Sequence, residues 1–225
     1  GLDKRAQTVM HYSRDGMLLD IGCASGSFLN HMRQKYGWKT YGVEVSSYAA
    51  QQARSKYNLN VFTGTLEQAK FPDCWFDAIT LWDVLEHLHN PFDTLKEIYR
   101  ILKPGGVIAF RVPNGDSYDA RIFGVYWAGL DAPRHLYIFQ KATIQKALNE
   151  NGFEIKKMTS RRGSYMGFAM SMRMWMNGRG VKRENREYFT KVMYHPVTRL
   201  AFAPIFYLYS SLEHSAELTI AAVKN

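Results

Sequence analysis

Short apolar runs alternate with amphipathic segments from residue 17 to about residue 112. The runs predict buried strands, because their apolar positions are continuous and lack the spacing of a helix face. The segments between the runs predict helices, since they carry apolar residues on one side and begin or end at capping residues. We expect strands at 17–21, 39–45, 60–64, 76–83 and 107–112, and helices at 28–37, 46–57 and 90–106.

This alternation predicts an α/β fold in which βαβ units build a doubly wound, mostly parallel sheet covered on both faces. Ligands of such sheets bind beyond the carboxyl ends of the strands. After residue 113 the pattern changes to a long aromatic and glycine-rich loop, and then a helix and two further strands are expected. These later elements are placed at 141–152, 153–160 and 216–223.

The stretch "MLLDIGCASGSF" (17–28) places five small residues, 22–26, directly after the first strand and before a helix. Small residues let a ligand lie against backbone N–H groups, and the N-terminus of the following helix favours negative charge. Glu44 ends the second strand, eighteen residues after Gly26. A carboxylate there can accept both hydroxyls of a ribose. The alternative is a solvated acid at a strand end.

Two cofactor classes use such a turn and acid. Dinucleotide enzymes need G-x-G-x-x-G, and the spacing here does not fit it. The pattern acid-x-G-x-G-x-G, used by S-adenosylmethionine enzymes, is filled with one substitution by Asp20, Gly22, Ala24 and Gly26.

The chain resembles class I S-adenosylmethionine-dependent methyltransferases of the small-molecule type. It is most similar to the branch that includes quinone O-methyltransferases and sugar and natural-product methyltransferases. The resemblance rests on "LDIGCASGSF", "GVEVS", "FDAITLWDVLEHLHNPFDTLKEIYRILKPGGVIAFRVPN" and "DAPRHLYIF". It covers about residues 17–160 and the closing strand. It implies a Rossmann-like sheet of seven strands, mostly parallel with an antiparallel last strand, and a helical insertion before that strand.

The resemblance also implies roles for particular residues. The small residues of the turn would lie under the methionine and ribose of the cofactor, Glu44 would bind the ribose hydroxyls, and residues at the ends of the third and fourth strands would flank the adenine and the sulfonium. The implied cofactor-binding residues are Asp20, Gly22, Cys23, Ala24, Gly26, Glu44, Val45, Thr65, Leu66, Trp82 and Asp83.

Two of these positions depart from the family pattern. Ala24 stands where the middle glycine is usual, and we expect its methyl group to be tolerated. Thr65 stands where an acid commonly holds the adenine amino group, so that contact falls to the Leu66 backbone or to Glu67.

Methyl transfer to oxygen needs a general base, and histidine is the usual choice near neutral pH. His135, with Asp131 beside it in "DAPRHLYIF", is the expected catalytic base or substrate contact. The alternative is a structural histidine that is hydrogen-bonded within its loop.

Asp83, Glu86 and His87 match positions that hold a divalent metal, commonly magnesium, in the quinone O-methyltransferase branch. The alternative is that Glu86 and His87 brace the floor of the cofactor site by hydrogen bonds. This second interpretation is preferred, so no residue is assigned as a metal ligand.

We expect one methyltransferase domain over 1–225, with a cofactor-binding core at 17–160, a helical lid or insertion at about 163–212 and a closing strand at 216–223. Met166, Met170 and Met174 fall on one side of a helix if that insertion is helical. Such a stripe belongs either to a core or to the wall of a site for a hydrophobic acceptor.

The net charge of +9 favours anionic partners. The basic residues are dispersed, and the fourth strand reads "LWDVLE" where RNA methyltransferases carry an Asn/Asp-Pro-Pro-aromatic signature, so no nucleic-acid partner is expected. Contact with anionic lipid through 161–212 is an open alternative. Two cysteines without a CxxC pattern and the lack of an 18-residue apolar run favour a cytoplasmic protein, with peripheral binding to the inner membrane face left open.

The expected function is transfer of a methyl group from S-adenosylmethionine to a small or lipid-linked acceptor at oxygen, with S-adenosylhomocysteine as product. The alternatives are methylation at carbon or nitrogen of a sugar or natural product, and a non-catalytic cofactor-binding partner subunit. The oligomeric state stays open.

Overall fold

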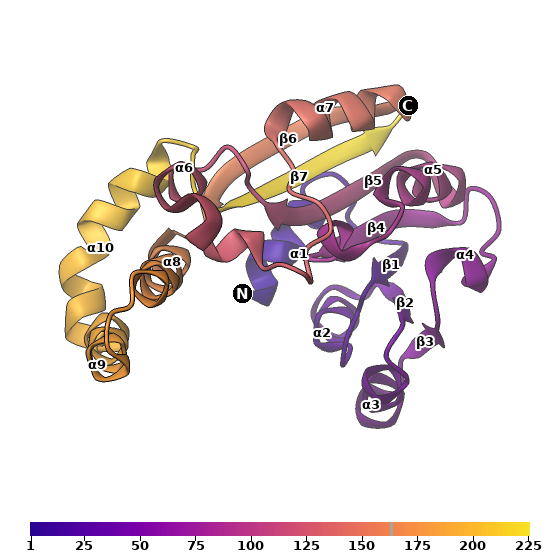
Figure 1. Cartoon of the computed structure of the whole chain (residues 1–225). Helices are drawn as coiled ribbons and strands as arrows, with labels where there is room; N and C mark the ends of the chain where they lie inside the picture. Colours follow the sequence, from indigo (N-terminus) through magenta and orange to yellow (C-terminus); the bar gives the residue numbers. More distant parts are fainter. Residues whose placement is uncertain (163) are drawn as a thin grey trace. The chain divides into compact units, whose positions relative to one another are not determined.

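The computed structural model, drawn in Figure 1, describes residues 1–162 and 164–225. The chain divides into two compact units. The first, which we call the sheet unit, comprises Gly1–Arg111, Ile144–Met158 and Thr219–Asn225. The second, the helical unit, comprises Val112–Thr143 and Thr159–Leu218. Gly163, at the expected start of the insertion, lies outside the described residues.

Seven strands form one sheet, as the fold resemblance implies, and their order is β3-β2-β1-β4-β5-β7-β6. The pairs β1–β2, β2–β3, β1–β4 and β4–β5 are parallel, whereas the β5-β7-β6 end is antiparallel. The chain proceeds outwards from β1 in one direction and restarts at β4 in the other, so the sheet has its topological switch point between β1 and β4. The strands are β1 (Met17–Ile21), β2 (Lys39–Glu44), β3 (Asn60–Thr63), β4 (Phe76–Trp82), β5 (Leu102–Pro113), β6 (Phe153–Arg162) and β7 (Glu217–Lys224).

The helices of the sheet unit bury their apolar sides in a core that they share with the strands. In β1, Leu18 belongs to a core cluster that also holds residues of the first three helices, and the next residue, Leu19, points to the opposite face. Phe28, Leu29 and Met32 form the buried side of α2. The helical elements are α1 (Leu2–Met10), α2 (Ser27–Tyr36), α3 (Ser47–Tyr57), α4 (Leu66–Ala69), η1 (Leu85–His87), α5 (Pro91–Ile101) and α7 (Lys141–Glu150), of which α7 begins in the helical unit.

Two local predictions differ from the structure. The helix expected over 90–106 ends at Ile101, and β5 begins at Leu102, because Leu102 already pairs with Phe76 of β4 across an irregular register. Asn90 stands at the N-cap position of α5, but its side chain makes no capping hydrogen bond. The N-terminal helix α1 was not predicted, since only Ala6 and Val9 in it are buried.

The helical unit contains α6 (Tyr118–Phe123), the short turns η2 (Gly124–Tyr126) and η3 (Ala128–Leu130), and α8 (Ser164–Gly178), α9 (Arg183–Tyr194) and α10 (Pro196–Ser211). The helical insertion before the last strand is therefore confirmed. Met166, Met170 and Met174 of α8 are 42%, 54% and 39% exposed, so the interpretation of this stripe as core is wrong. Among the described residues, no helix combines the length and the apolar character that crossing a membrane requires.

Candidate cofactor site

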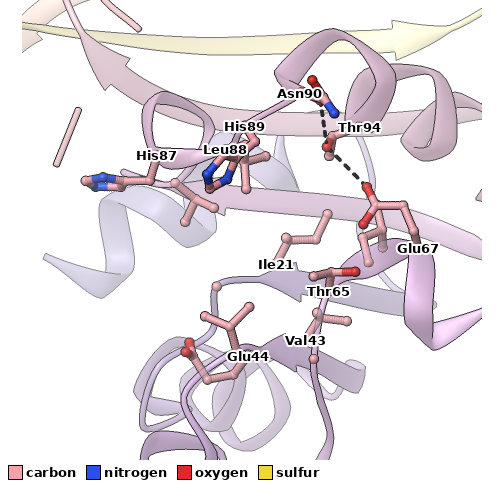
Figure 2. Close-up of a pocket in the computed structure, with 15 residues that line it drawn as sticks. Ile21, Val43, Glu44, Thr65, Glu67, His87, Leu88, His89, Asn90 and Thr94 are labelled. Carbon is pink, nitrogen blue, oxygen red and sulfur yellow. Dashed lines mark hydrogen bonds between the residues drawn. The ribbon is translucent and has the colours of Figure 1, made fainter. Parts of the chain in front are cut away.

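A cavity of about 630 Å³ opens at the carboxyl ends of β1, β2 and β3, next to the switch point (Figure 2). It lies within the sheet unit. Five of the predicted cofactor-binding residues line it, and so does Glu67, the substitute proposed for the adenine contact. The five are Gly22, Glu44, Val45, Thr65 and Leu66.

The turn after β1 needs small residues for two physical reasons. Gly22, Ala24 and Gly26 all have a left-handed backbone, with φ of 68°, 48° and 77°. Side chains at the two glycines would also collide with the packed interior, because a Cβ on Gly22 would lie 2.5 Å from Val84 Cγ2 and one on Gly26 would lie 2.4 Å from Leu59 Cδ1. The conformation and packing of the turn therefore account for its small residues without reference to a ligand.

Glu44 is fixed to this turn by hydrogen bonds. Its side chain is buried, its Oε2 accepts from the backbone N–H of Ala24 at 2.8 Å, and its Oε1 accepts from the N–H of Ser46 at 2.8 Å. A carboxylate has about four lone-pair positions, so each oxygen can accept one more hydrogen bond from the cavity side. The two backbone N–H groups therefore hold the carboxylate in one orientation and leave it able to accept two further hydrogen bonds.

Asp20 lies at the end of β1 and is almost completely buried. Its Oδ1 accepts a hydrogen bond of 2.6 Å from the hydroxyl of Thr80. Burial raises the pKa of Asp20 to about 7, although the Thr80 hydrogen bond and the charge of Arg5 both oppose that change. Burial likewise raises the pKa of the Cys23 thiol, so this side chain suits a packed turn position better than a nucleophile.

The segment after β3 forms the far side of the cavity. Thr65 caps the short helix α4 through a reciprocal pair of hydrogen bonds with Gln68. The Glu67 carboxylate faces the cavity and accepts from the hydroxyl of Thr94 at 3.4 Å; Figure 2 shows this pair, together with Asn90, on the side away from Glu44. Glu67 is thus the only acid that this segment offers to the cavity among the described lining residues.

Asp83, after β4, is paired with cations rather than left open to the cavity. Its carboxylate accepts from the guanidinium of Arg111, with 2.7 Å from Nε to Oδ1, and Arg5 lies 3.6 Å from its Oδ2. Arg5 also lies over the ring of Trp82, 5.2 Å from its centre. Sequence reasoning missed Arg5, because no motif marks the polar segment that forms α1.

These pairings do not fit the magnesium site considered for Asp83, Glu86 and His87. Asp83 is neutralised by two arginines, and it is not among the described side chains that lie close enough together to hold an ion. His87 lines the cavity, and Glu86 is buried beside it in the chain. No step of the reaction is therefore derived through this metal.

His135 and Asp131 lie in the helical unit. The Nδ1 of His135 is 2.8 Å from the carbonyl oxygen of Gly129, which can only accept, so Nδ1 carries the proton of the neutral ring. Nε2 is then the basic nitrogen, and it lies 3.8 Å from the carboxylate of Asp131. The contact of His135 with Gly129 is the hydrogen bond expected of a structural histidine. The same contact leaves Nε2 unprotonated in the neutral ring, which is the state that a general base needs.

The comparisons with known proteins identify the family. Residues 4–157 match the methyltransferase domain family, so the chain belongs to it, and the resemblance to class I S-adenosylmethionine-dependent methyltransferases is confirmed. The ubiquinone biosynthesis O-methyltransferase of Saccharophagus degradans is 25% identical over 70% of this chain and 69% of that protein. The sterol 24-C-methyltransferase of Aspergillus fumigatus is 30% identical over 47% of this chain and 30% of that protein.

Solved structures support the fold. A putative sarcosine dimethylglycine methyltransferase from Galdieria sulphuraria superposes with a TM-score of 0.67 at 15% identity, covering 100% of this chain and 84% of the other. The chain spans between 56% and 69% of the length of four curated relatives that it matches.

We predict that Ala24→Gly stabilises the protein by about 1 kcal/mol, because a left-handed conformation costs an alanine roughly that much and a glycine almost nothing. Urea unfolding measures the change. Ala49→Gly, within helix α3, is the matched control and should lose about 1 kcal/mol. Equal losses in both variants would contradict the strain assigned to Ala24.

We predict that Asp20 makes stability fall as pH rises from about 4 to about 7. In this range the unfolded chain loses the Asp20 proton, whereas the folded chain keeps it because of the raised pKa. Asp20→Asn should remove up to about 4 kcal/mol of this fall.

Urea unfolding at several pH values between 4 and 8 tests this prediction for Asp20. Asp15→Asn, at an exposed position, is the control. If the wild type and Asp20→Asn lost stability in parallel as pH rises, Asp20 would not be the group that is protonated.

Proposed function

We propose that the protein transfers the methyl group of S-adenosylmethionine to an oxygen atom of a small or lipid-linked acceptor. The observation that carries the proposal is the Glu44 carboxylate, held by the N–H of Ala24 and turned to a cavity at the switch point of the sheet. Membership of the methyltransferase domain family and the O-methyltransferase relative support it.

The residues around the cavity fit the cofactor's chemical groups. Glu44 would accept the two ribose hydroxyls on its remaining lone pairs. Glu67 would accept from the adenine amino group in place of the acid that Thr65 lacks. Arg5 carries a positive charge beside Trp82 and would attract the carboxylate of the methionine portion.

S-adenosylmethionine supplies a methyl group already activated by a sulfonium, so the protein mainly has to align the acceptor and remove its proton. In the proposed step, Nε2 of His135 takes the proton of the acceptor hydroxyl as the oxygen–carbon bond forms. Bound S-adenosylmethionine would supply the methyl group and retain the electron pair of the sulfur–carbon bond, which would leave S-adenosylhomocysteine. Asp131, 3.8 Å from Nε2, would stabilise the imidazolium that results.

Methylation at carbon is the second candidate, and the sterol 24-C-methyltransferase relative favours it. A carbon acceptor that is already nucleophilic has no hydroxyl proton to lose. The pH dependence of turnover in His135→Ala distinguishes methylation at oxygen from methylation at carbon.

We predict that Glu44→Ala weakens binding of S-adenosylhomocysteine at least about 100-fold, because two hydrogen bonds to a charged group are each worth about 1.5–3 kcal/mol. Calorimetry gives the dissociation constant. The exposed acid Glu150→Ala is the control and should bind as the wild type does. Retained affinity in Glu44→Ala would remove the ribose role.

We predict that His135→Ala lowers turnover about 100-fold or more while cofactor affinity stays within about two-fold. Catechols with and without an apolar tail serve as acceptors, and S-adenosylhomocysteine formation is the readout. The defect should shrink at a pH where the acceptor hydroxyl ionises by itself.

The exposed histidine variant His11→Ala is the control and should retain the wild-type rate. A pH-independent defect in His135→Ala, or none, would contradict the assignment of His135 as general base.

A further inference from the structure

Helix α10 is apolar around its circumference although only one side of it is packed. It contains no acidic residue and one basic residue, Arg199. A helix of this kind is expected in a protein core or in contact with a membrane. Most of its large apolar side chains, and one directly after it, are instead at least two fifths exposed: Val197, Leu200, Phe202, Ile205, Tyr207, Leu208 and Leu212.

The packed side of α10 is held by aromatic contacts within the helical unit. The ring of Phe206 lies 4.9 Å from that of Tyr165 and 5.6 Å from that of Phe168, both on α8. The hydroxyl of Tyr209 donates to Asp119 of α6 at 2.9 Å. These contacts fix which side of α10 faces outwards, and that side carries Leu200 and Leu208, which are 76% and 65% exposed.

The segment that forms α8, α9 and α10 carries a net positive charge. Residues 164–211 hold seven basic and two acidic side chains. One of the acids, Glu187, is already paired with Arg183 at 2.7 Å. The basic residues are Arg173, Arg179, Lys182, Arg183, Arg186, Lys191 and Arg199, and all but Arg186 are exposed.

Exposed tyrosine and tryptophan side chains accompany the apolar residues of this unit. Tyr188 and Tyr207 are 71% and 78% exposed, and Trp175 is 37% exposed. Such side chains combine an apolar ring with a polar group, which suits the boundary between water and lipid.

We propose that the outer side of α10, residues 197, 200, 201, 204, 205 and 208, docks on an anionic lipid surface. The helix would lie in the plane of the interface, with its apolar side among the acyl chains and the basic residues of α8 and α9 near the headgroups. A second copy of this chain is the less favourable occupant, because a two-fold contact would bring two such basic segments together. The inference does not depend on methyl transfer, but it would bring a lipid-linked acceptor to the protein.

Flotation with vesicles tests this proposal. We expect the wild type to float with vesicles of phosphatidylglycerol and phosphatidylcholine, and to bind phosphatidylcholine alone at least about ten-fold more weakly. The double variant Leu200→Glu/Leu208→Glu should weaken binding to the anionic vesicles at least about ten-fold, since it removes two inserted side chains. Both sites are exposed, so its melting temperature and its affinity for S-adenosylhomocysteine should match the wild type.

The matched control is Tyr48→Glu/Phe92→Glu, which makes the same change of charge at exposed aromatic residues of α3 and α5. It should float as the wild type does. Absence of binding to anionic vesicles, or equal binding by the α10 variant and the control, would overturn the proposal. A further contradictory result would be a wild type that forms a dimer in solution and does not bind lipid, if Leu200→Glu/Leu208→Glu dissociates that dimer. In that case α10 would contact a second copy of the chain.

Discussion

The hydrogen bond from the Ala24 N–H to the Glu44 carboxylate is the constraint on which the cofactor site depends. It joins the turn after β1 to the end of β2, two strands that the parallel register Ile21↔Val43 places side by side. It holds a buried carboxylate in one orientation, which an acid at a solvated strand end would not have. The left-handed backbone of the turn is what directs the Ala24 N–H towards Glu44. The turn, the end of β2 and the Glu44 carboxylate are therefore held in one arrangement. This arrangement determines the shape of the cavity beside them.

Most of the sheet, and five of the residues that line the cavity, could be predicted from sequence, because their signals are local. A buried parallel strand, a glycine turn and an acid at a strand end can each be recognised within a few residues, and the number of strands and the antiparallel last strand follow from the family resemblance. Pairings between distant residues carry no such signal. Arg111, which neutralises Asp83, is 28 positions away in the sequence. Arg5, which lies over Trp82, belongs to a helix that no sequence motif predicts. Sequence alone therefore allows a metal at Asp83, whereas the structure pairs this carboxylate with arginines.

In the helical unit, the sequence does not show which apolar side chains are buried. Its composition correctly indicated helices rich in methionine and aromatic residues, but composition does not distinguish a buried side from an exposed one. That distinction is made by Phe206 and Tyr209, which pack against α8 and α6 and leave Leu200 and Leu208 in water. In the sheet unit, in contrast, residues of β1 and of the first three helices pack into a buried core cluster. The helical unit thus buries some apolar side chains, such as Phe123 and Trp127, and exposes others, such as Leu200 and Leu208.

The central claim is that Glu44 receives the ribose of an adenosyl cofactor without releasing the Ala24 N–H. A crystal structure with bound S-adenosylhomocysteine tests it most directly. We predict both ribose hydroxyls within hydrogen-bond distance of the Glu44 carboxylate, the Ala24 N–H still donating to Oε2, and the adenine between Leu66 and Glu67. A nucleoside bound elsewhere, or one in this cavity whose ribose does not touch Glu44, would contradict the claim.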